Sequence, residues 1–539
     1  MEAPFIQILA GSAALSVAGC VASAKSKNGH VSVDIDASAK QRSISPEIYG
    51  ASYAGDAGAE YRCPVDRIGG NNMSRYNWLE NADNKGADWF FQSIGMPDTT
   101  PGQHVTTFCT TAKRAGAVAM ITVPMLGYVA KLAPNRGKLW SFSVKKYGHQ
   151  EKTDAQYCPD AGNGKQSNGK NILGNNPLEA NVAAPPTFFI PWLKNLASSM
   201  PNLKYICLDN EPGLWHETHR DVVPAGVSLD ELWKRSLETS QMCKAIAPKV
   251  NICGPEEWGW TGYMYSPLDA QFGKENGWHN PFKPLPDKRN HGNIDPMTFL
   301  LRKFAEAEQA GGKRLLDVFT LHFYPQGGEF SGDTSPAMCQ RRNRSTRALW
   351  DPQYKDETWI ADTVQLIPRM KELVQKNYPG TRLGITEYSW GADEHINGAT
   401  AQADVLGILG REGLDLACRW TSPKQNSFAF KAIQMYTNPG GHGHGFGNTS
   451  VFCKTAQPDD VAAFAALDTT TDTLTIMLIN KLDTDAQVSI NMKNFTSGAT
   501  QVYTLGKDNI IKRSQVAELR NRITLSGPSI KLLRVARKK

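Results

Sequence analysis

The run Leu316-Asp-Val-Phe-Thr-Leu-His-Phe-Tyr-Pro325 has the pattern on which the fold depends, a short apolar segment that ends in polar and aromatic side chains. A helical pattern precedes it at residues 297–310. Seven similar apolar runs lie at residues 47–53, 65–70, 117–124, 204–212, 250–256, 382–388 and 414–421. Further helix-like stretches lie at residues 105–115, 189–200, 229–246, 360–377 and 399–412, and the pair Ser228 and Glu231 is typical of a helix start.

Strands that alternate with helices pair in parallel, and eight such units close into a barrel. The sequence therefore predicts an α/β fold with a (β/α)8 TIM-like barrel over residues 47–454. An open, doubly wound sheet is the alternative.

A different pattern begins near residue 455. Apolar and polar residues alternate at 473–480, 486–492 and 500–504, and no helical stretch of comparable length follows. This alternation predicts an additional C-terminal antiparallel β-sandwich domain over residues 455–539. Residues 30–36 alternate in the same way, so we expect residues 30–46 to supply an N-terminal strand to this domain.

Residues 1–29 have the character of a leader and linker. Residues 5–20 are apolar, stop at small residues and are too short to span a membrane, which is typical of a signal peptide. The segment Val17-Ala-Gly-Cys20 resembles a bacterial lipobox, although Glu2 without a Lys or Arg makes the preceding region atypical. We expect a secreted or cell-surface bacterial protein whose one link to a membrane is a lipid anchor at Cys20, and we expect a monomer.

Composition favours a carbohydrate partner. The chain of 539 residues holds 13 Trp, 16 Tyr and 20 Phe, and aromatic faces stack on sugar rings. The net charge of +7 is small for this length and the basic residues are scattered, so no nucleic-acid surface is predicted. The buried apolar runs that contain Cys207, Cys253 and Cys418 indicate free, buried thiols.

The predicted strands end in side chains that can perform chemistry. In a barrel of this kind function lies where the strands end, and a carboxylate there is costly to desolvate without a reason. Two carboxylates, Glu211 and Glu387, follow the fourth and seventh runs. The other polar and aromatic side chains at these ends are Arg67, Asn71, Asn210, Trp258, Trp260, His322, Tyr324 and Trp420.

Five motifs together resemble glycoside hydrolase family 44. They are Arg67-Ile-Gly-Gly-Asn-Asn-Met-Ser-Arg-Tyr-Asn-Trp78, Asp209-Asn-Glu-Pro212, Gly254-Pro-Glu-Glu-Trp-Gly-Trp260, His322-Phe-Tyr-Pro325 and Thr386-Glu-Tyr388. The resemblance runs from about residue 31 to the C-terminus. It implies a β/α barrel with a β-sandwich, and endoglucanase or xyloglucanase activity on β-1,4-glucans, with xylan as a further substrate of some members. Ile68 departs from the aromatic residue expected there.

The resemblance also assigns roles within a retaining mechanism. It implies that Glu211 is the acid/base and that Glu387 is the nucleophile. We expect Arg67 to lie near Glu387, and burial and the partner's charge to raise the pKa of Glu211. Asn210 is expected to bond the sugar 2-hydroxyl, and Tyr324 or His322 to orient Glu387. Trp420 is expected to floor the cleavage subsite, and Trp258 and Trp260 to line its neighbours.

Several alternatives stay open at this point. Glu256 and Glu257 are adjacent, so both cannot face one glycosidic bond, and one is expected to be a hydrogen-bonding group of the cleft. No cofactor is required, but the acidic segments 80–83 and 154–160 could bind a structural calcium ion; a solvated loop is the simpler reading. The segment Gly441-His-Gly-His444 indicates a flexible turn rather than a metal site.

Two other functions compete with a retaining endo-β-1,4-glucanase. One is an endo-β-1,4-xylanase or a bifunctional glucanase-xylanase. The other, of a different class, is a carbohydrate-binding lipoprotein without catalysis. A neutral sugar needs no paired carboxylates for binding alone, so Glu211 and Glu387 favour an enzyme.

Overall fold

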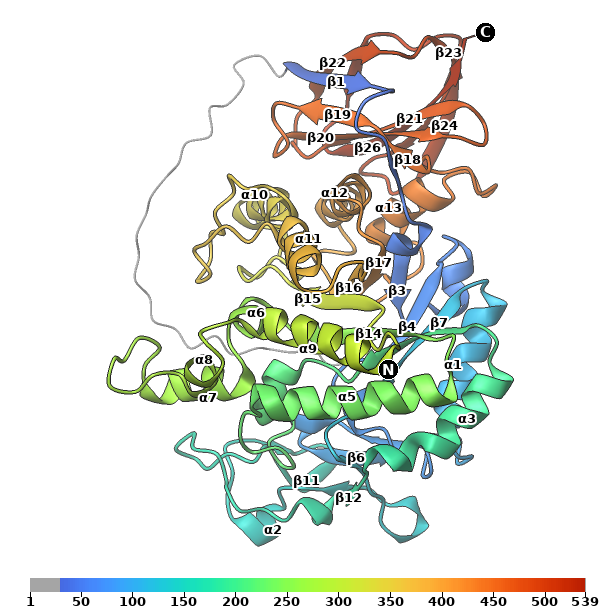
Figure 1. Ribbon diagram of the computed structural model, residues 1–539. Coiled ribbons are helices and arrows are strands. Elements are labelled where there is room, and N and C mark those ends of the chain that lie inside the picture. Colours follow the sequence, from blue (N-terminus) through green and yellow to red (C-terminus); the bar gives the residue numbers. More distant parts are fainter. Residues whose placement is uncertain (1–29, 539) are drawn as a thin grey trace.

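The computed structural model describes residues 30–538, and its centre is a closed barrel of eight parallel strands (Figure 1). In chain order these strands are β3 (Gly50–Ser52), β4 (Val65–Ile68), β7 (Val118–Val123), β13 (Leu203–Leu208), β14 (Asn251–Glu257), β15 (Val318–Phe323), β16 (Arg382–Tyr388) and β17 (Leu416–Arg419). Each lies within or beside one of the eight predicted runs, so the predicted barrel is confirmed. The open sheet is excluded because β3 pairs with both β17 and β4.

A layer of buried side chains from the strands fills the interior of the barrel. They are apolar or sulfur-bearing: Val65, Met120, Tyr205, Cys207, Cys253, Val318, Leu416 and Cys418. All described cysteines are unpaired, and the three predicted buried thiols are in this layer. Because this layer leaves no room for a ligand, chemistry is confined to the carboxyl ends of the strands.

Six helices lie where the apolar spacing predicted them. They are α1 (Gln103–Arg114), α3 (Ile190–Ser199), α5 (Leu229–Ile246), α9 (Pro296–Gly311), α11 (Leu366–Asn377) and α12 (Ile396–Glu412). The expected start of α11 at residue 360 is wrong, because the helix begins at Leu366. Helix α13 (Phe428–Thr437), which was not predicted, follows β17 and is buried on most of its faces. A helix buried nearly all round has no clear apolar period.

Two long connections, after β4 and after β7, build a region of short strands beside the barrel (lower part of Figure 1). It contains β5 (Ala82–Asn84), β6 (Gln92–Gly95), β8 (Tyr128–Ala130), β9 (Leu139–Trp140), β10 (Thr153–Asp154), β11 (Cys158–Gly162) and β12 (Asn181–Ala183). They pair in three small antiparallel sheets. Strands of two to five residues are too short to show an alternating pattern, so the sequence did not predict them.

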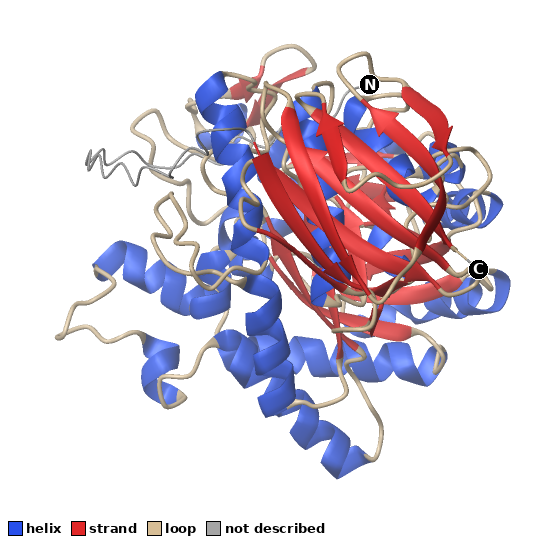
Figure 2. Ribbon diagram, turned by 90° about the horizontal axis from the view of Figure 1, so that it is seen from above, coloured by secondary structure: helices blue, strands red, loops and turns tan. Residues whose placement is uncertain are grey.

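The β-domain consists of two sheets (Figure 2). The four-stranded sheet has the order β19 (Phe452–Thr455), β1 (His30–Asp36), β22 (Ala486–Lys493), β25 (Arg522–Leu525). The seven-stranded sheet has the order β2 (Arg42–Ser43), β18 (Thr449–Ser450), β20 (Val461–Asp468), β21 (Thr473–Asn480), β26 (Ser529–Arg537), β23 (Ser497–Leu505), β24 (Ile511–Val516). The N-terminal strand β1 pairs in parallel with β22. Strands β18 and β19 belong to this domain although both begin before residue 455.

The β-domain packs directly on the barrel through α12 and α13. Residues Ile396 to Gly410 of α12 are all buried. The ring of Phe464 on β20 occupies the space where a Cβ on Gly407 of α12 would lie, 2.2 Å from it. A buried ion pair crosses the same interface, with Lys481 Nζ 2.6 Å from Asp404 Oδ2. The two domains therefore share one continuous core.

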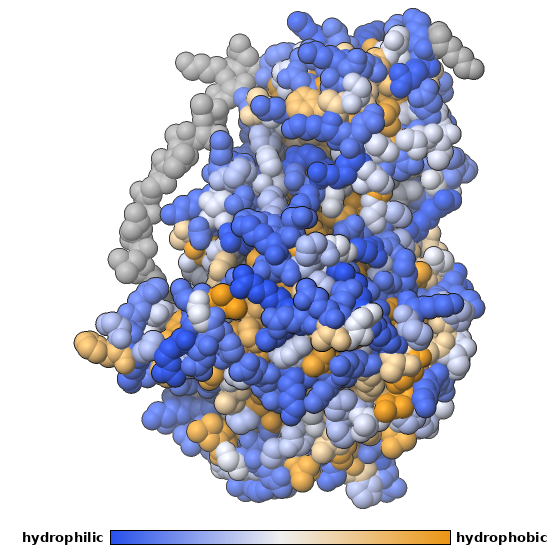
Figure 3. All heavy atoms as spheres, viewed as in Figure 1, coloured by the Kyte–Doolittle hydropathy of each residue, from blue (hydrophilic) through white to orange (hydrophobic). Residues whose placement is uncertain are grey.

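The face of the molecule seen in Figure 3 is mostly hydrophilic, with apolar residues scattered over it in small groups. Over residues 30–538, no helix has both the length and the apolar character needed to cross a membrane. The predicted leader and Cys20 lie outside the described residues.

Candidate active site

The carboxyl ends of four barrel strands bring together the polar side chains that were predicted from the sequence. Arg67 is on β4, Asn210 and Glu211 follow β13, His322 is on β15 and Glu387 is on β16. Arg67 and His322 are fully buried, and Glu387 is 5% exposed. Charged side chains this deeply buried must be paired with one another.

Glu387 is held through both carboxylate oxygens. Nη1 of Arg67 donates to Oε1 at 2.8 Å, and the hydroxyl of Tyr324 donates to Oε2 at 2.8 Å. Arg67 places a full positive charge against this carboxylate. With two donors in fixed positions the carboxylate has one orientation, which a nucleophile needs in order to attack a single carbon atom.

Glu211 is held less tightly and lies nearer to solvent. Its side chain is 14% exposed, and Oε1 lies 3.0 Å from Nδ1 of His322. Burial raises the pKa of Glu211; His322 opposes this shift, whereas the negative charge of Glu387 adds to it. A raised pKa lets a carboxyl group hold a proton near neutral pH, as a general acid must.

The two carboxyl groups face one another across a short gap. One oxygen of Glu211, one oxygen of Glu387 and one ring nitrogen of His322 all lie within 4.8 Å of each other. Retaining glycosidases keep their carboxyl groups about 5 to 5.5 Å apart, whereas inverting enzymes need about 6.5 to 9.5 Å to admit a water molecule. The spacing observed between the oxygens fits the retaining arrangement.

His322 joins three carboxylates. Its Nδ1 lies 3.0 Å from Glu211 and 3.6 Å from Glu387, and its Nε2 lies 3.2 Å from Glu256. Burial by itself lowers the pKa of His322, but the surrounding carboxylates outweigh burial and raise it to about 10. The ring is then an imidazolium at neutral pH. Because an imidazolium has no free lone pair to offer, Glu211, His322 and Glu387 fit an ion-pair network better than a metal site.

Backbone geometry aims these side chains into the cleft. Glu211 has φ 45° and ψ 60°, and Asp209 and Glu256 also have positive φ values near 61°. Such left-handed conformations are uncommon for residues other than glycine and cluster at functional sites. The amide of Glu211 donates to the carbonyl of Glu256 at 3.0 Å, which ties the ends of β13 and β14 together.

Comparison with known proteins agrees with this geometry. The model of glycoside hydrolase family 44 matches residues 82–327. Endoglucanase A of Paenibacillus lautus is 30% identical over 526 residues, which cover 93% of this chain and 71% of that protein. The chain belongs to glycoside hydrolase family 44.

Three further relatives extend the comparison. The crystal structure of CelM2, a bifunctional glucanase-xylanase from a metagenome library, has 48% identity and a TM-score of 0.91, and covers 94% of this chain and 99% of that one. A family 44 xyloglucanase of Paenibacillus polymyxa, solved with xyloglucan, has 28% identity and a TM-score of 0.75, with 94% and 100% covered. The β-mannanase/endoglucanase A of Caldicellulosiruptor saccharolyticus is 32% identical over 505 residues, which cover 86% of this chain. This chain spans 35% of the length of that relative.

In this family 44 chain, Asn210 and Asn71 extend the hydrogen-bond network toward the surface. Nη2 of Arg67 donates to Oδ1 of Asn210 at 3.2 Å, and Nδ2 of Asn210 donates to Oδ1 of Asn71 at 3.0 Å. Asn71 in turn donates to Asp88 at 3.0 Å. The Asn210 amide uses one of its two N–H groups in these contacts, which leaves the other for a sugar hydroxyl.

Trp420 lies beside the catalytic groups. Its ring is 5.7 Å from the guanidinium of Arg67 and 5.8 Å from the ring of Tyr53. A Cβ on Gly70 would lie 2.4 Å from the Trp420 ring, and Gly70 has φ 86°. Only glycine fits there, so the Gly69-Gly70 turn allows the indole to lie against the base of the cleft.

The other two tryptophans have different neighbours. Trp258 packs on Gly213, just beyond Glu211, where a Cβ would lie 2.9 Å from the indole. Trp260 stacks on the guanidinium of Arg369 at 5.0 Å, and Arg369 belongs to the outer helix α11. Trp260 therefore packs between α6 (Trp260–Met264) and α11, and its expected role in lining a subsite stays a prediction.

Glu256 has a larger part in the site than the hydrogen-bonding role expected for it, because it is fully buried between Arg67, His322 and Thr320. Burial raises its pKa, but these partners outweigh burial and lower it to about 2. Thr320 was missed entirely, although it precedes His322 by two residues on β15. Residues two apart on a strand share a face, and that spacing could have indicated the contact.

Glu257 points away from Glu256, as adjacent residues on a strand do. It is 2% exposed and accepts from the amides of Gly213, at 3.2 Å, and Trp258, at 2.9 Å. Burial raises the pKa of Glu257 to about 8. It therefore supports the loop that carries Glu211 rather than facing the gap between Glu211 and Glu387.

The acidic segments considered for calcium are hydrogen-bonded within the protein. Asp83 accepts from Asn72 at 2.8 Å and pairs with Lys85, and Asp154 accepts from Gln92 at 2.8 Å. Asp83 and Asp154 are both buried, so the expectation of a solvated loop is wrong for these two residues. Both oxygens of Asp154 and Oδ2 of Asp83 have protein donors, and Oδ1 of Asp83 lies 2.6 Å from Nζ of Lys85, which suits a structural acceptor better than a calcium ligand.

Proposed function

We propose that this family 44 glycoside hydrolase is a retaining endo-β-1,4-glucanase that cleaves internal bonds of cellulose-like glucans and xyloglucan. The observation that carries the proposal is the pair Glu211 and Glu387 with oxygens within 4.8 Å, on either side of His322. Paired carboxylates at this distance serve hydrolysis, and binding of a neutral sugar alone does not need them. The carbohydrate-binding lipoprotein is disfavoured for this reason.

In the proposed mechanism, Glu387 attacks the anomeric carbon while Glu211 protonates the departing glycosidic oxygen. This step forms a covalent glycosyl-enzyme. Glu211, now a carboxylate, then removes a proton from water, which releases the sugar with its configuration retained. The contacts of Arg67 and Tyr324 with Glu387, and the raised pKa of Glu211, support this division of roles.

The substrate class rests on the relatives. Endoglucanase, xyloglucanase and bifunctional glucanase-xylanase are the activities named for the relatives above. The structure with 48% identity is the bifunctional one, and this favours xylan as a second substrate. We therefore propose glucan and xyloglucan as the main substrates and xylan as the subsidiary one, with the chain acting as a monomer.

Export and lipidation of Cys20 are also proposals, supported by the sequence alone. Wild-type protein expressed in a bacterial host should incorporate radiolabelled palmitate and remain with the membrane fraction. Cys20→Ala should remove the label and release an active enzyme. Label that persists in Cys20→Ala would disprove the anchor.

A reducing-sugar assay on carboxymethylcellulose, xyloglucan and birchwood xylan tests the enzymatic proposal. We expect activity on all three substrates, with xylan the poorest, and a rapid fall in the viscosity of carboxymethylcellulose because cleavage is internal. Release of single disaccharides without a fall in viscosity would indicate an exo-acting enzyme. No hydrolysis by a folded protein would favour the binding function.

A further inference from the structure

A second cavity lies far from the carboxylates, where the barrel meets the β-domain. Residues 438–447 connect α13 to β18 and cover one end of the seven-stranded sheet. The cavity between this connection and the sheet has a volume of about 210 Å³. Barrel helices run opposite to the strands, so the end of α13 is at the face of the barrel away from Glu211 and Glu387.

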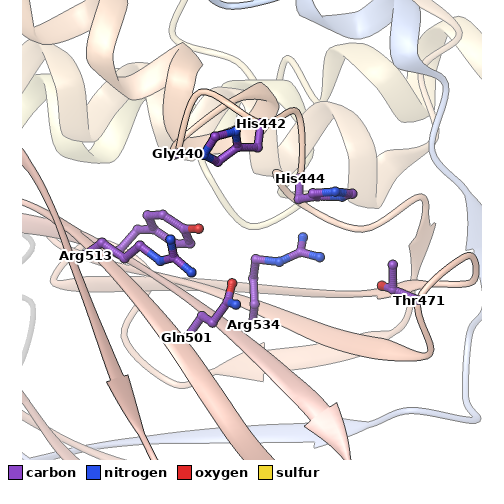
Figure 4. Close-up of a pocket in the computed structure, with 8 residues that line it drawn as sticks. Gly440, His442, His444, Thr471, Gln501, Arg513 and Arg534 are labelled. Atoms are coloured by element: carbon purple, nitrogen blue, oxygen red, sulfur yellow. The ribbon is translucent and has the colours of Figure 1, made fainter.

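The cavity is lined mainly by polar and basic side chains (Figure 4). His442 and His444 come from the connection, Gln501 from β23, Arg513 from β24 and Arg534 from β26. In Figure 4, Gln501, Arg513 and Arg534 project from the sheet toward the connection that carries the two histidines. Side chains from three neighbouring strands therefore converge with the two histidines on one space.

The polar character is unexpected on this face of the sheet. Gln501 pairs with Arg534, and Tyr503 pairs with both Leu532 and Arg513, so these residues all share one face. Nearer the barrel the same face is apolar, and Tyr503 and Leu532 belong to the core shared with α12 and α13. The change from apolar to basic residues coincides with the cavity.

Most of the polar groups have no partner. His442, His444 and Arg513 are exposed and Gln501 is partly buried, and within residues 30–538 their side chains make no hydrogen bond or ion pair, so they can face a ligand from solvent. Arg534 is the exception, because it is 7% exposed, pairs with Asp468 at 3.2 Å and also donates to the carbonyl of Gly445. Asp468 thus offsets the charge of Arg534, and the charge of Arg513 is left over.

We propose that this cavity binds a single carboxylate-bearing sugar, a uronic acid residue of an acidic polysaccharide. The guanidinium of Arg513 and the amide of Gln501 would donate to the carboxylate, because a planar guanidinium suits a carboxylate with two oxygens. A volume of about 210 Å³ is much larger than one water molecule or a bare inorganic ion needs, and it leaves room for a sugar ring. The histidines would contact the ring hydroxyls.

The preference for a sugar over another carboxylate rests on the proposed function. Binding at this cavity needs no hydrolysis, so the two proposals fail separately. An enzyme that hydrolyses xyloglucan but binds no uronate would overturn only the cavity, and a folded protein that binds uronate without hydrolysing any glucan would overturn only the enzymatic proposal.

Isothermal titration of the full chain at low ionic strength tests the cavity. The probes are methyl β-glucuronide, neutral methyl β-glucoside and inorganic phosphate. We expect the glucuronide to bind and the glucoside not to bind. Arg513→Ala should weaken glucuronide binding about ten-fold or more, since it removes a charge-assisted hydrogen bond. Gln501→Ala should weaken it by a smaller factor.

Lys512→Ala is the matched control. Lys512 is adjacent to Arg513 on β24, carries the same charge and faces the opposite side, where it pairs with Asp508 at 2.5 Å. This variant should bind glucuronide as the wild type does, and Arg513→Ala should hydrolyse xyloglucan at the wild-type rate. If Lys512→Ala and Arg513→Ala lost the same affinity for glucuronide, the effect would come from the net charge of the protein, and the proposed site would be overturned. Binding of phosphate without glucuronide would overturn the uronate assignment.

Discussion

At the scale of single residues, the two carboxyl groups of the site differ in their hydrogen-bond partners and in their exposure. Glu387 has donors on both oxygens, whereas Glu211 has one partner, His322, and a more exposed side chain. His322 carries the positive charge that lets three carboxylates share one buried space. The difference in surroundings, rather than in residue type, separates a nucleophile from an acid.

The roles of Glu387 and Glu211 can be separated by chemical rescue. Glu387→Gln should lose activity by several orders of magnitude, because no glycosyl-enzyme forms. Glu211→Ala should still react with dinitrophenyl cellobioside, whose leaving group needs no protonation, and should accumulate the covalent intermediate. Azide, which needs no general base, should restore turnover and give a β-glycosyl azide, measured by product NMR. A β-azide product from Glu387→Ala together with an α-azide product from Glu211→Ala would reverse the assignment.

Glu257 should make the stability of the folded protein depend on pH. Its pKa is about 8 in the folded state and near 4.3 in an unfolded chain, so the folded state keeps a proton that the unfolded state loses. The proton on Glu257 therefore stabilises the folded wild type fully below about pH 4.3. This contribution should be lost progressively as pH rises toward 8. Glu257→Gln does not titrate and should be spared this loss.

Urea unfolding between pH 5 and 8 measures this effect. The stability of Glu257→Gln relative to wild type should increase with pH, by an amount of the order of a few kcal/mol. The exposed Glu238→Gln is the control and should follow wild type at each pH. A constant difference between Glu257→Gln and wild type across this range would show that Glu257 does not titrate there.

At the scale of elements, the ends of strands and helices are set by local hydrogen bonds. Ser228 begins α5, where its hydroxyl accepts from the amide of Glu231 at 3.2 Å. The side chain of Glu231 pairs with Arg235. The predicted start of this helix at Ser228 is confirmed by the hydrogen bond that the Ser228 hydroxyl accepts. This bond satisfies one of the amides that every helix leaves unpaired at its first turn.

Ser228→Ala should destabilise the protein by about 1 kcal/mol, because the amide of Glu231 loses its acceptor. The midpoint of urea unfolding should fall, while the rate of hydrolysis under native conditions stays near that of wild type. Ser198→Ala, at an exposed position near the end of α3, should leave the midpoint unchanged. Equal midpoints for Ser228→Ala and Ser198→Ala would argue against a capping role.

At the scale of the whole molecule, the barrel and the β-domain pack through one shared core. Helix α12, which is buried from Ile396 to Gly410, contacts β20, β21 and β26. Lys481 of the β-domain pairs with Asp404 of α12, and its Nζ also donates to the carbonyl of Asn343 at 3.1 Å. Both charges are buried, so each depends on its partner across the interface.

Lys481→Met should destabilise the protein by about 3 to 5 kcal/mol, because Asp404 is left buried with no opposite charge. The double variant Lys481→Met/Asp404→Leu removes both charges and should recover most of that loss. Calorimetry on wild type, Lys481→Met and the double variant measures these changes in stability. We expect a single unfolding transition for wild type. Two well-separated transitions in wild type would show that the domains unfold independently.

The sequence by itself determined the barrel, the β-domain and the residues at the strand ends, because these depend on local periodicity. Each barrel strand is a short apolar run. Glu211, His322 and Glu387 lie at the ends of such runs, and this position can be seen in the sequence alone. The identity of the side chains at the strand ends could therefore be predicted from the sequence.

Only the tertiary structure decided which of these side chains meet. The contact of Glu256 with Arg67 and His322, the packing of Trp260 on Arg369 and the basic cavity at Arg513 join residues from distant parts of the chain. The short strands after β4 and β7 likewise form only because longer elements hold them together. Such contacts depend on how the barrel closes and how the sheet packs on α12 and α13, and no local pattern records the distance between residues far apart in sequence.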